Sequence, residues 1–461
     1  MRHLLGIALA SLLLAVTLGA WLWFDSSGAD GPVNEVLGAA QTPIPTSAPT
    51  ATPKAWQPAR LLPLTPVPVT YRTLDPSFAA LPAAWAFSGT YAGGAYQIEV
   101  PDRWNGDVVY YAHGFRGNPP ELTVSVPALR QYFIDRGYAW AASSYTRNGY
   151  EPGIAARDTL ALKSVFEQQV GKPRFSYIYG ESMGGNVVTF SLEQYPHEYD
   201  GGLTECGVVT GPQILEYFAS WAALAQYFSG VPFADGALTP TELDAIFSSQ
   251  VVPALGSPAA PTDAGRQFTD VVMRLTGGER PFFNEGLAHQ FSSNFTIIAH
   301  AVELAGAASG AAQNENTAYI VSDGASVSTD QLNREIARLA PSPAYRNAAA
   351  FPEFQPMTGR IERPLLTLHG TGDLFVPISL EQSYREIVHT AGRDGLLVQR
   401  AVRRSGHCNF SEEERERAFD DLTAWVETGE RPEGEDLTGD LSNAGLPFTT
   451  PLEPSDPSLL P

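Results

Sequence analysis

One short motif, Gly180-Glu-Ser-Met-Gly-Gly185, constrains the fold of this chain more than any other feature of the sequence. An apolar run at 175–179 precedes the motif, and a helical pattern follows it. A serine between two such elements sits in a strained strand-to-helix turn that lifts its hydroxyl above the sheet. Side chains at Gly180 and Gly184, two positions either side of Ser182, would collide in that turn. The motif therefore predicts a strand, a sharp turn and a helix, with Ser182 as candidate nucleophile.

Short apolar runs alternate with helical patterns along the chain, which is typical of a parallel sheet with crossover helices. The run at 95–100 alternates apolar and polar residues, so we expect that strand to be half-exposed. The strand pattern stops between about 213 and 355, where the sequence is mostly helical. We therefore predict an α/β fold, a mostly parallel sheet flanked by helices and interrupted by a helical insertion. The expected strands are 95–100, 107–112, 138–142, 175–179, 202–210, 364–368 and 395–402.

The N-terminal region has the features of an exported protein. A basic start precedes an uncharged stretch at 4–24, which is typical of an export signal and just long enough to span a bilayer. Dense proline and threonine at 41–53 predict an extended spacer. We expect an extracellular protein, either secreted or anchored through residues 4–24 to the outer face of the cytoplasmic membrane. The predicted segments are 1–24 (signal or anchor), 25–70 (linker), 71–212 (first part of the sheet domain), 213–355 (helical cap), 356–430 (second part) and 431–461 (tail).

Charge and cysteine content exclude two classes of function. The formal net charge of −21 at pH 7 repels phosphate backbones, so we expect no nucleic-acid partner. The only cysteines, Cys206 and Cys408, are too few for a disulfide scaffold, and their spacing fits no metal site. We therefore expect no bound metal.

Three histidines follow the strand expected at 364–368, and each is a candidate general base. In this type of fold the nucleophile, the acid and the base occur in that order along the chain. His369 precedes the candidate acid, and His389 lies within a helical stretch at 380–391. His407 lies in a loop between the last strand and the last helix, where a base can reach the serine. We therefore expect His407 to be the base.

The acid is expected at the end of the strand at 364–368. Asp373 follows a Gly-Thr-Gly turn there. A carboxylate in this place accepts the ring N–H of His407, fixes its tautomer and stabilises the imidazolium. Glu181 is the alternative, but it belongs to the serine turn and would have to reach back to the histidine. We expect Asp373 to be the acid.

Acyl transfer also needs two fixed N–H donors for the oxyanion. We expect one from the backbone of Met183, directly after the serine. The other is expected from the backbone of Phe115, in the turn His113-Gly114-Phe115 that follows the strand at 107–112. Gly114 allows a close approach of the chain, and His113 is expected to hold the loop.

These four signals together resemble the α/β-hydrolase superfamily over about residues 71–428. The resemblance implies a serine hydrolase that works through an acyl-enzyme, without a cofactor, and a cap that shapes substrate choice. The expected substrate is a small-molecule or polymer-derived carboxylic ester. Two alternatives remain. One is a peptidase resembling the prolyl oligopeptidase group, although no propeller repeat is visible. The other is a non-catalytic binding module on the same scaffold, although no member of the triad is missing.

The pair His407-Cys408 also resembles the tannase and feruloyl-esterase group. In that group a cysteine after the catalytic histidine bonds to a cysteine directly before the serine. Here Glu181 precedes the serine, so the pattern is broken. On this resemblance we expect Cys408 to pair with Cys206, in the strand after the nucleophile helix, and to tether the base loop. The alternative is two buried free thiols.

Overall fold

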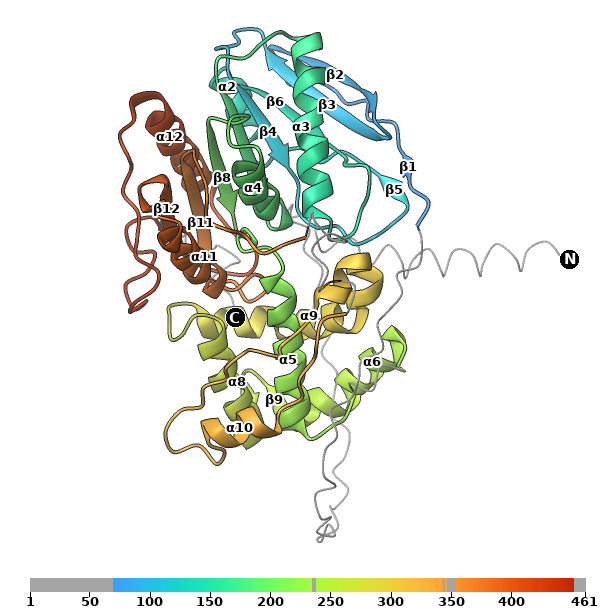
Figure 1. Cartoon of the computed structure of the whole chain (residues 1–461), viewed down its shortest axis with the longest axis vertical. Helices are drawn as coiled ribbons and strands as arrows, with labels where there is room; N and C mark the ends of the chain where they lie inside the picture. The colour runs from blue at the N-terminus through green and yellow to red at the C-terminus, as the bar shows by residue number, and fades with distance from the viewer. Residues whose placement is uncertain (1–68, 234–237, 343–344, 346–353, 452–461) are drawn as a thin grey trace, which may run out of the picture. The chain divides into compact units, whose positions relative to one another are not determined.

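A sheet of eight strands forms the centre of the computed structural model, which describes residues 69–233, 238–342, 345 and 354–451 (Figure 1). The strands are β2 (Ala84–Tyr91), β3 (Gly94–Pro101), β4 (Val108–Ala112), β6 (Ala139–Ser143), β7 (Ser176–Glu181), β8 (Gly201–Glu205), β11 (Leu365–Gly372) and β12 (Leu397–Ser405). Their order across the sheet is β12-β11-β8-β7-β4-β6-β3-β2. The six strands from β12 to β6 are parallel, whereas β3 and β2 are antiparallel. A separate pair joins β1 (Arg72–Thr73) to β5 (Glu121–Leu122).

All seven predicted strands are present, but three details of the prediction are wrong. Strand β11 runs to Gly372, so Gly370-Thr371-Gly372 belongs to the strand and is not a turn before Asp373. Strand β3 is buried along its whole length, not half-exposed. Its polar Glu99 accepts hydrogen bonds from Arg130 and Trp140, and the unpredicted β2 forms the edge of the sheet. Strand β8 ends at Glu205, not at residue 210, because Cys206 adopts a positive φ of 46°.

Helices cover both faces of the sheet. Alternate residues of β4 point to opposite faces, as expected for a pleated strand: Tyr110 packs in one apolar cluster and Val109 in the other. The Tyr110 cluster includes residues of α3 (Pro152–Gln169), α4 (Met183–Gln194) and α11 (Ser379–Thr390). The Val109 cluster includes residues of α2 (Arg130–Asp135) and α12 (Glu412–Thr428). This two-sided burial explains the near-continuous apolar runs of the parallel strands.

The cap is the chain between β8 and β11, and its described part is mostly helical, as predicted (Figure 1). Its aromatic residues mainly form its own core. The ring of Trp221 lies 5.2 Å from that of Phe268 and 6.2 Å from that of Phe295. The elements of the cap are α5 (Gln213–Ser229), α6 (Pro240–Ile246), a π-helical turn (Phe247–Val251), α7 (Val252–Leu255), β9 (Gly256–Ser257), β10 (Ala260–Pro261), α8 (Asp263–Leu275), α9 (Phe283–Ala305), a 3₁₀ turn (Gly306–Ala311) and α10 (Thr329–Glu335).

The described part of the predicted tail, 431–451, has no helix or strand but packs against β12. The N–H of Glu435 donates to the carbonyl of Gln399 at 2.7 Å, and Leu437 and Leu441 are buried. The predicted export segment at 4–24 and the spacer at 41–53 lie outside the described residues, and both stay predictions. Among the described helices, none combines the length and apolar character that a membrane crossing needs.

Candidate active site

Ser182 occupies a sharp turn between β7 and α4. Its φ of 57° is strained for a residue with a side chain, and its N–H donates to the carbonyl of Glu205 on the neighbouring strand at 3.0 Å. A Cβ atom on Gly180 would lie 2.3 Å from the carbonyl oxygen of Gly184. A Cβ on Gly184 would lie 2.0 Å from the carbonyl oxygen of Ala112 at the end of β4. Glycine is therefore required at both positions, at Gly180 by a collision within the turn, as predicted, and at Gly184 by a collision with the neighbouring strand β4.

The turn after β4 approaches the serine closely. A Cβ on Gly114 would lie 3.1 Å from Cβ of Ser182. His113 holds this turn: its ring stacks on that of Tyr145 at 4.0 Å, and its Nε2 accepts a hydrogen bond from Arg116 at 2.9 Å. Burial and the nearby Arg116 cation keep the pKa of His113 well below its ordinary value. His113 is thus a neutral structural residue, in agreement with the prediction.

Asp373 and His407 form a hydrogen-bonded pair. Nδ1 of His407 donates to Oδ2 of Asp373 at 2.6 Å. The other carboxylate oxygen accepts the N–H groups of Phe375 and Val376 at 2.8 and 3.1 Å. Asp373 is fully buried, and Nε2 of His407 is also buried and has no hydrogen-bond partner among the described residues, Ser182 included. The imidazole therefore keeps one nitrogen free to accept a proton.

The ends of four parallel strands bring these groups to one edge of the sheet. Ser182 follows β7, Gly114 follows β4, Asp373 follows β11 and His407 follows β12. A serine in a strained turn after the strand, with the acid and then the histidine later in the chain, is the defining arrangement of one fold. This is an α/β-hydrolase fold. The carboxyl edge of the strands is also where open α/β sheets bind their ligands.

Comparisons with known proteins give distant matches. No family model matches the chain. An o-phthalyl amidase from Xanthobacter agilis is 23% identical over 414 residues, which cover 77% of this chain and 90% of the amidase. An esterase and feruloyl esterase B, both from Aspergillus oryzae, are similar solved structures, with 15% and 14% identity and TM-scores of 0.43 and 0.44. Each match covers 76% of this chain and 80% or 81% of the other. The names of all three proteins are those of hydrolases.

The other candidates for the acid and the base form hydrogen bonds with other residues of the α/β-hydrolase fold. Glu181 accepts hydrogen bonds from Tyr111 and Arg415, both at 2.7 Å. His369 is buried, with Nε2 bonded to the carbonyl of Val376 at 2.8 Å. His389 is exposed and pairs with Asp394 at 3.1 Å. Among the candidates for the acid and the base, the structure therefore pairs Asp373 with His407.

The predicted disulfide between Cys206 and Cys408 is present. Cys206 follows Glu205, whose carbonyl binds the N–H of Ser182, and Cys408 follows His407. The disulfide therefore ties the base loop to the strand beside the nucleophile. Both sulfur atoms and a ring nitrogen of His407 lie within 4.8 Å of one another. Because the sulfurs are bonded to each other, this group is not available to a metal.

Arg415 also connects the base loop to the strands beside the serine, and the sequence did not predict this role. Its guanidinium donates to Glu181, to Glu205 and, at 2.9 Å, to the carbonyl of Cys408. Burial raises the pKa of Glu205, and the positive charge of Arg415 partly offsets this increase. One buried side chain of α12 thus contacts residues next to the serine, next to the first cysteine and next to the histidine. It lies in a run of six glutamates and arginines at 412–417, a pattern that is typical of a solvated helix face.

The pKa of Asp373 bears on its role. Burial raises this pKa, but the attraction of His407 and the hydrogen bonds that the carboxylate accepts outweigh burial, and the net pKa lies below the ordinary value. The carboxylate is therefore ionised at neutral pH. An ionised carboxylate on Nδ1 stabilises positive charge on the imidazole.

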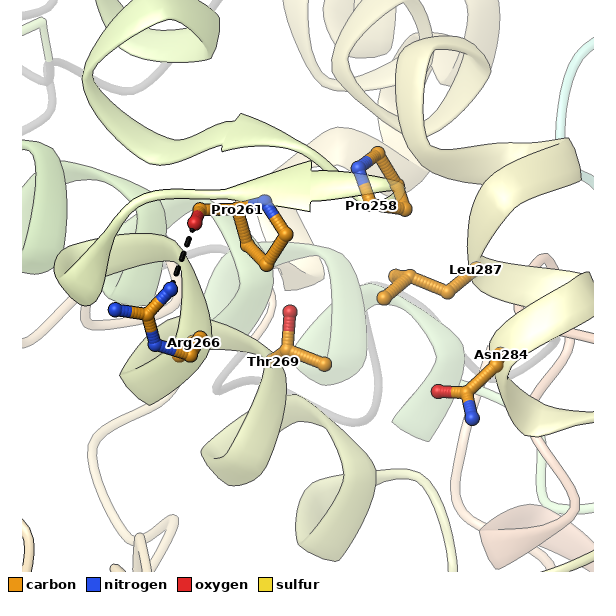
Figure 2. Close-up of a pocket in the computed structure, with 6 residues that line it drawn as sticks. All are labelled: Pro258, Pro261, Arg266, Thr269, Asn284 and Leu287. Carbon is orange, nitrogen blue, oxygen red and sulfur yellow. Dashed lines mark hydrogen bonds between the residues drawn. The ribbon is translucent and has the colours of Figure 1, made fainter.

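A hollow of about 220 Å³ lies within the cap (Figure 2). It contains no member of the Ser182, Asp373 and His407 set, and its volume is below the roughly 300–1,000 Å³ of typical ligand pockets. The guanidinium of Arg266, which lines the hollow, donates to the carbonyl of Pro261 at 2.9 Å. We assign the hollow no ligand. Its lining consists of Pro258, Pro261, Arg266, Thr269, Asn284 and Leu287.

Proposed function

We propose that this protein is a serine hydrolase that cleaves carboxylic esters through an acyl-enzyme intermediate. Ser182 is the nucleophile, His407 the general base and Asp373 the residue that orients it. The observation that carries the proposal is the 2.6 Å hydrogen bond between Asp373 and Nδ1 of His407, which leaves Nε2 of His407 free. The disulfide ties the loop that carries His407 to the strand beside the serine turn. The proposed substrate is a small-molecule or polymer-derived ester.

In the first half-reaction the serine oxygen forms a bond to the ester carbonyl carbon while His407 takes its proton. The oxyanion is stabilised by the backbone N–H groups of Met183 and Phe115. The close approach of Gly114 to Ser182 supports this role for the turn that contains Phe115. His407 then gives the proton to the leaving alcohol as the carbon–oxygen bond breaks.

In the second half-reaction water attacks the acyl-enzyme. His407 takes a proton from the water as the new carbon–oxygen bond forms, and it returns the proton to Ser182 when the acid is released. Asp373 stays ionised and stabilises the imidazolium in both halves. These steps need only the side chains and backbone named above.

Amide hydrolysis is the second candidate, because the curated relative with 23% identity is an amidase, o-phthalyl amidase. The same residues carry out both reactions, but an amine leaves less readily than an alcohol, so its protonation by His407 contributes more. The name of this relative favours, as the substrate of such an amidase, an amide whose acyl group is aromatic. The peptidase resembling the prolyl oligopeptidase group and the non-catalytic module remain the further alternatives.

Rates on matched esters and amides decide between these candidates. We expect turnover of p-nitrophenyl esters, from acetate to long-chain and benzoate, to exceed that of the corresponding p-nitroanilides, with a proline p-nitroanilide and an o-phthalyl anilide in the same series. Faster turnover of the phthalyl amide than of any ester would replace the ester assignment by an aryl amidase. Activity on the proline anilide alone would indicate the peptidase, and no activity on any substrate would favour the binding module.

A further inference from the structure

Helix α9 of the cap lies directly against the loop that carries the candidate acid. A Cβ on Gly286 of α9 would lie 1.9 Å from the carbonyl oxygen of Gly372, so the two backbones touch. Just before the helix, Nε of the buried Arg280 donates to the carbonyl of Thr371 at 2.6 Å. The cap is therefore joined to the end of β11 through backbone contact and a buried hydrogen bond.

One side chain of α9 spans Asp373 and the residue after it. Oε1 of Gln290 accepts the N–H of Leu374 at 2.6 Å, and Nε2 of Gln290 donates to Oδ1 of Asp373 at 3.4 Å. Gln290 is only 4% exposed, so water does not compete for either bond. The amide thus fixes the peptide after the acid by a short bond and contacts the carboxylate itself by a longer one.

Two further cap residues hold the other side of the same peptide. The carbonyl of Leu374 accepts hydrogen bonds from Nδ2 of Asn294 at 3.0 Å and from the hydroxyl of Tyr217 at 2.5 Å. Both polar groups of Leu374 are therefore bonded to the cap. Displacing α9 from the core would break the bonds of Gln290 and Asn294 to this peptide.

We propose that Gln290 is a positioning residue of the active site, by which the cap holds Asp373 in the orientation that His407 needs. The inference rests on the proposed function. Oδ2 of Asp373 faces His407, and Oδ1 is held by Gln290 together with the N–H groups of Phe375 and Val376. The carboxylate cannot rotate without breaking these bonds. The cap thus belongs to the catalytic machinery and is not only a cover for the substrate.

Two substitutions distinguish the contributions of the two hydrogen bonds of Gln290. Gln290→Leu removes both. Gln290→Glu keeps the acceptor for the N–H of Leu374 but replaces the donor by a carboxyl group facing Asp373. Two carboxyl groups so close share a proton, so the introduced group stays protonated and donates at low pH but repels Asp373 once it ionises. Gln267→Glu, in cap helix α8 and away from the acid, is the matched control.

The pH dependence of kcat/KM distinguishes positioning from simple packing. We expect Gln290→Glu to be close to wild type at the acidic end of the profile and to lose about tenfold or more as pH rises, the scale of a hydrogen bond to a charged group. Gln290→Leu should lower kcat about tenfold at every pH with KM within about twofold. Gln267→Glu should follow wild type throughout. A deficit of Gln290→Glu that does not vary with pH, or no deficit, would overturn the proposal.

A spectroscopic readout is independent of turnover. With ¹⁵N-labelled histidine, the Nδ1 proton of His407 should give a downfield resonance, assigned by its loss in His407→Gln. We expect this resonance to shift upfield or disappear in Gln290→Leu and to shift with pH in Gln290→Glu. An unchanged resonance in both folded variants would refute the role of Gln290. If Gln290→Leu does not fold, Gln290→Glu alone decides. If wild type cleaves no ester or amide, the proposed function fails while the resonance still tests Gln290.

Discussion

Replacing Ser182 by alanine is expected to lower kcat on the best ester substrate on the order of a millionfold, the scale measured when a catalytic serine of this kind is removed. The substitution removes the oxygen that forms the acyl-enzyme and leaves the rest of the site in place. Alanine also fits the turn no worse than serine, because both carry a Cβ at the φ of 57°. Fold and thermal unfolding should therefore stay close to wild type while turnover is lost.

Ser191→Ala is the matched control for that experiment. Ser191 lies in α4, the helix that follows Ser182, is fully buried, and its hydroxyl has no hydrogen-bond partner among the described residues. Its removal should leave kcat within about twofold, since no described bond is lost. A rate for Ser182→Ala within about tenfold of wild type would exclude Ser182 as the nucleophile, as would an equal loss in both variants.

Replacing Asp373 by asparagine is expected to lower kcat by about ten-thousandfold, as in other serine hydrolases with this arrangement. The asparagine side chain keeps the size and most hydrogen bonds of the aspartate. It removes the negative charge that stabilises the imidazolium, and its amide allows the wrong tautomer of His407. Steady-state kinetics across pH measure the effect, which should persist at every pH at which the enzyme is active.

The exposed pair of His389 and Asp394 provides the control. It has a similar composition, with ring and carboxylate 3.1 Å apart, but both side chains are exposed to solvent. Asp394→Asn should therefore leave kcat and KM unchanged. If Asp373→Asn retained activity within about tenfold of wild type, the acid would have to be sought elsewhere, and the role proposed for Gln290 would fail with it.

The sequence predicted those parts of the site that depend on local chemistry. The serine turn is recognisable from its two glycines, although only Gly180 is required by a collision within the turn, with Gly184, whereas Gly184 is required by a collision with Ala112 of β4. Asp373 and His407 are recognisable because each follows an apolar strand, and parallel strands end at one edge of the sheet. The same reasoning, with the family resemblance, led to the disulfide that is present between Cys206 and Cys408.

What the sequence did not reveal depends on contacts between distant segments. Arg415 lies in a run of charged residues that is typical of a solvated helix face. The way α12 packs on the sheet places its side chain against Glu181 and Glu205. Gln290 stands in an apolar cap helix without any motif, and its role depends on how α9 packs on β11. Strand β3 looked half-exposed because Glu99 alternates with apolar residues, yet Glu99 is buried with Arg130. Periodicity reports polarity and cannot identify a buried partner far along the chain.

Labelling with a fluorophosphonate tests the central claim most directly. The reagent reacts with an activated serine, so the account predicts one adduct per chain, located by peptide mass mapping at Ser182, with loss of ester turnover in step with labelling. The adduct should be absent from Ser182→Ala and present at the wild-type rate in Ser191→Ala. An adduct at another serine, or undiminished ester hydrolysis by a protein that does not react, would contradict the account.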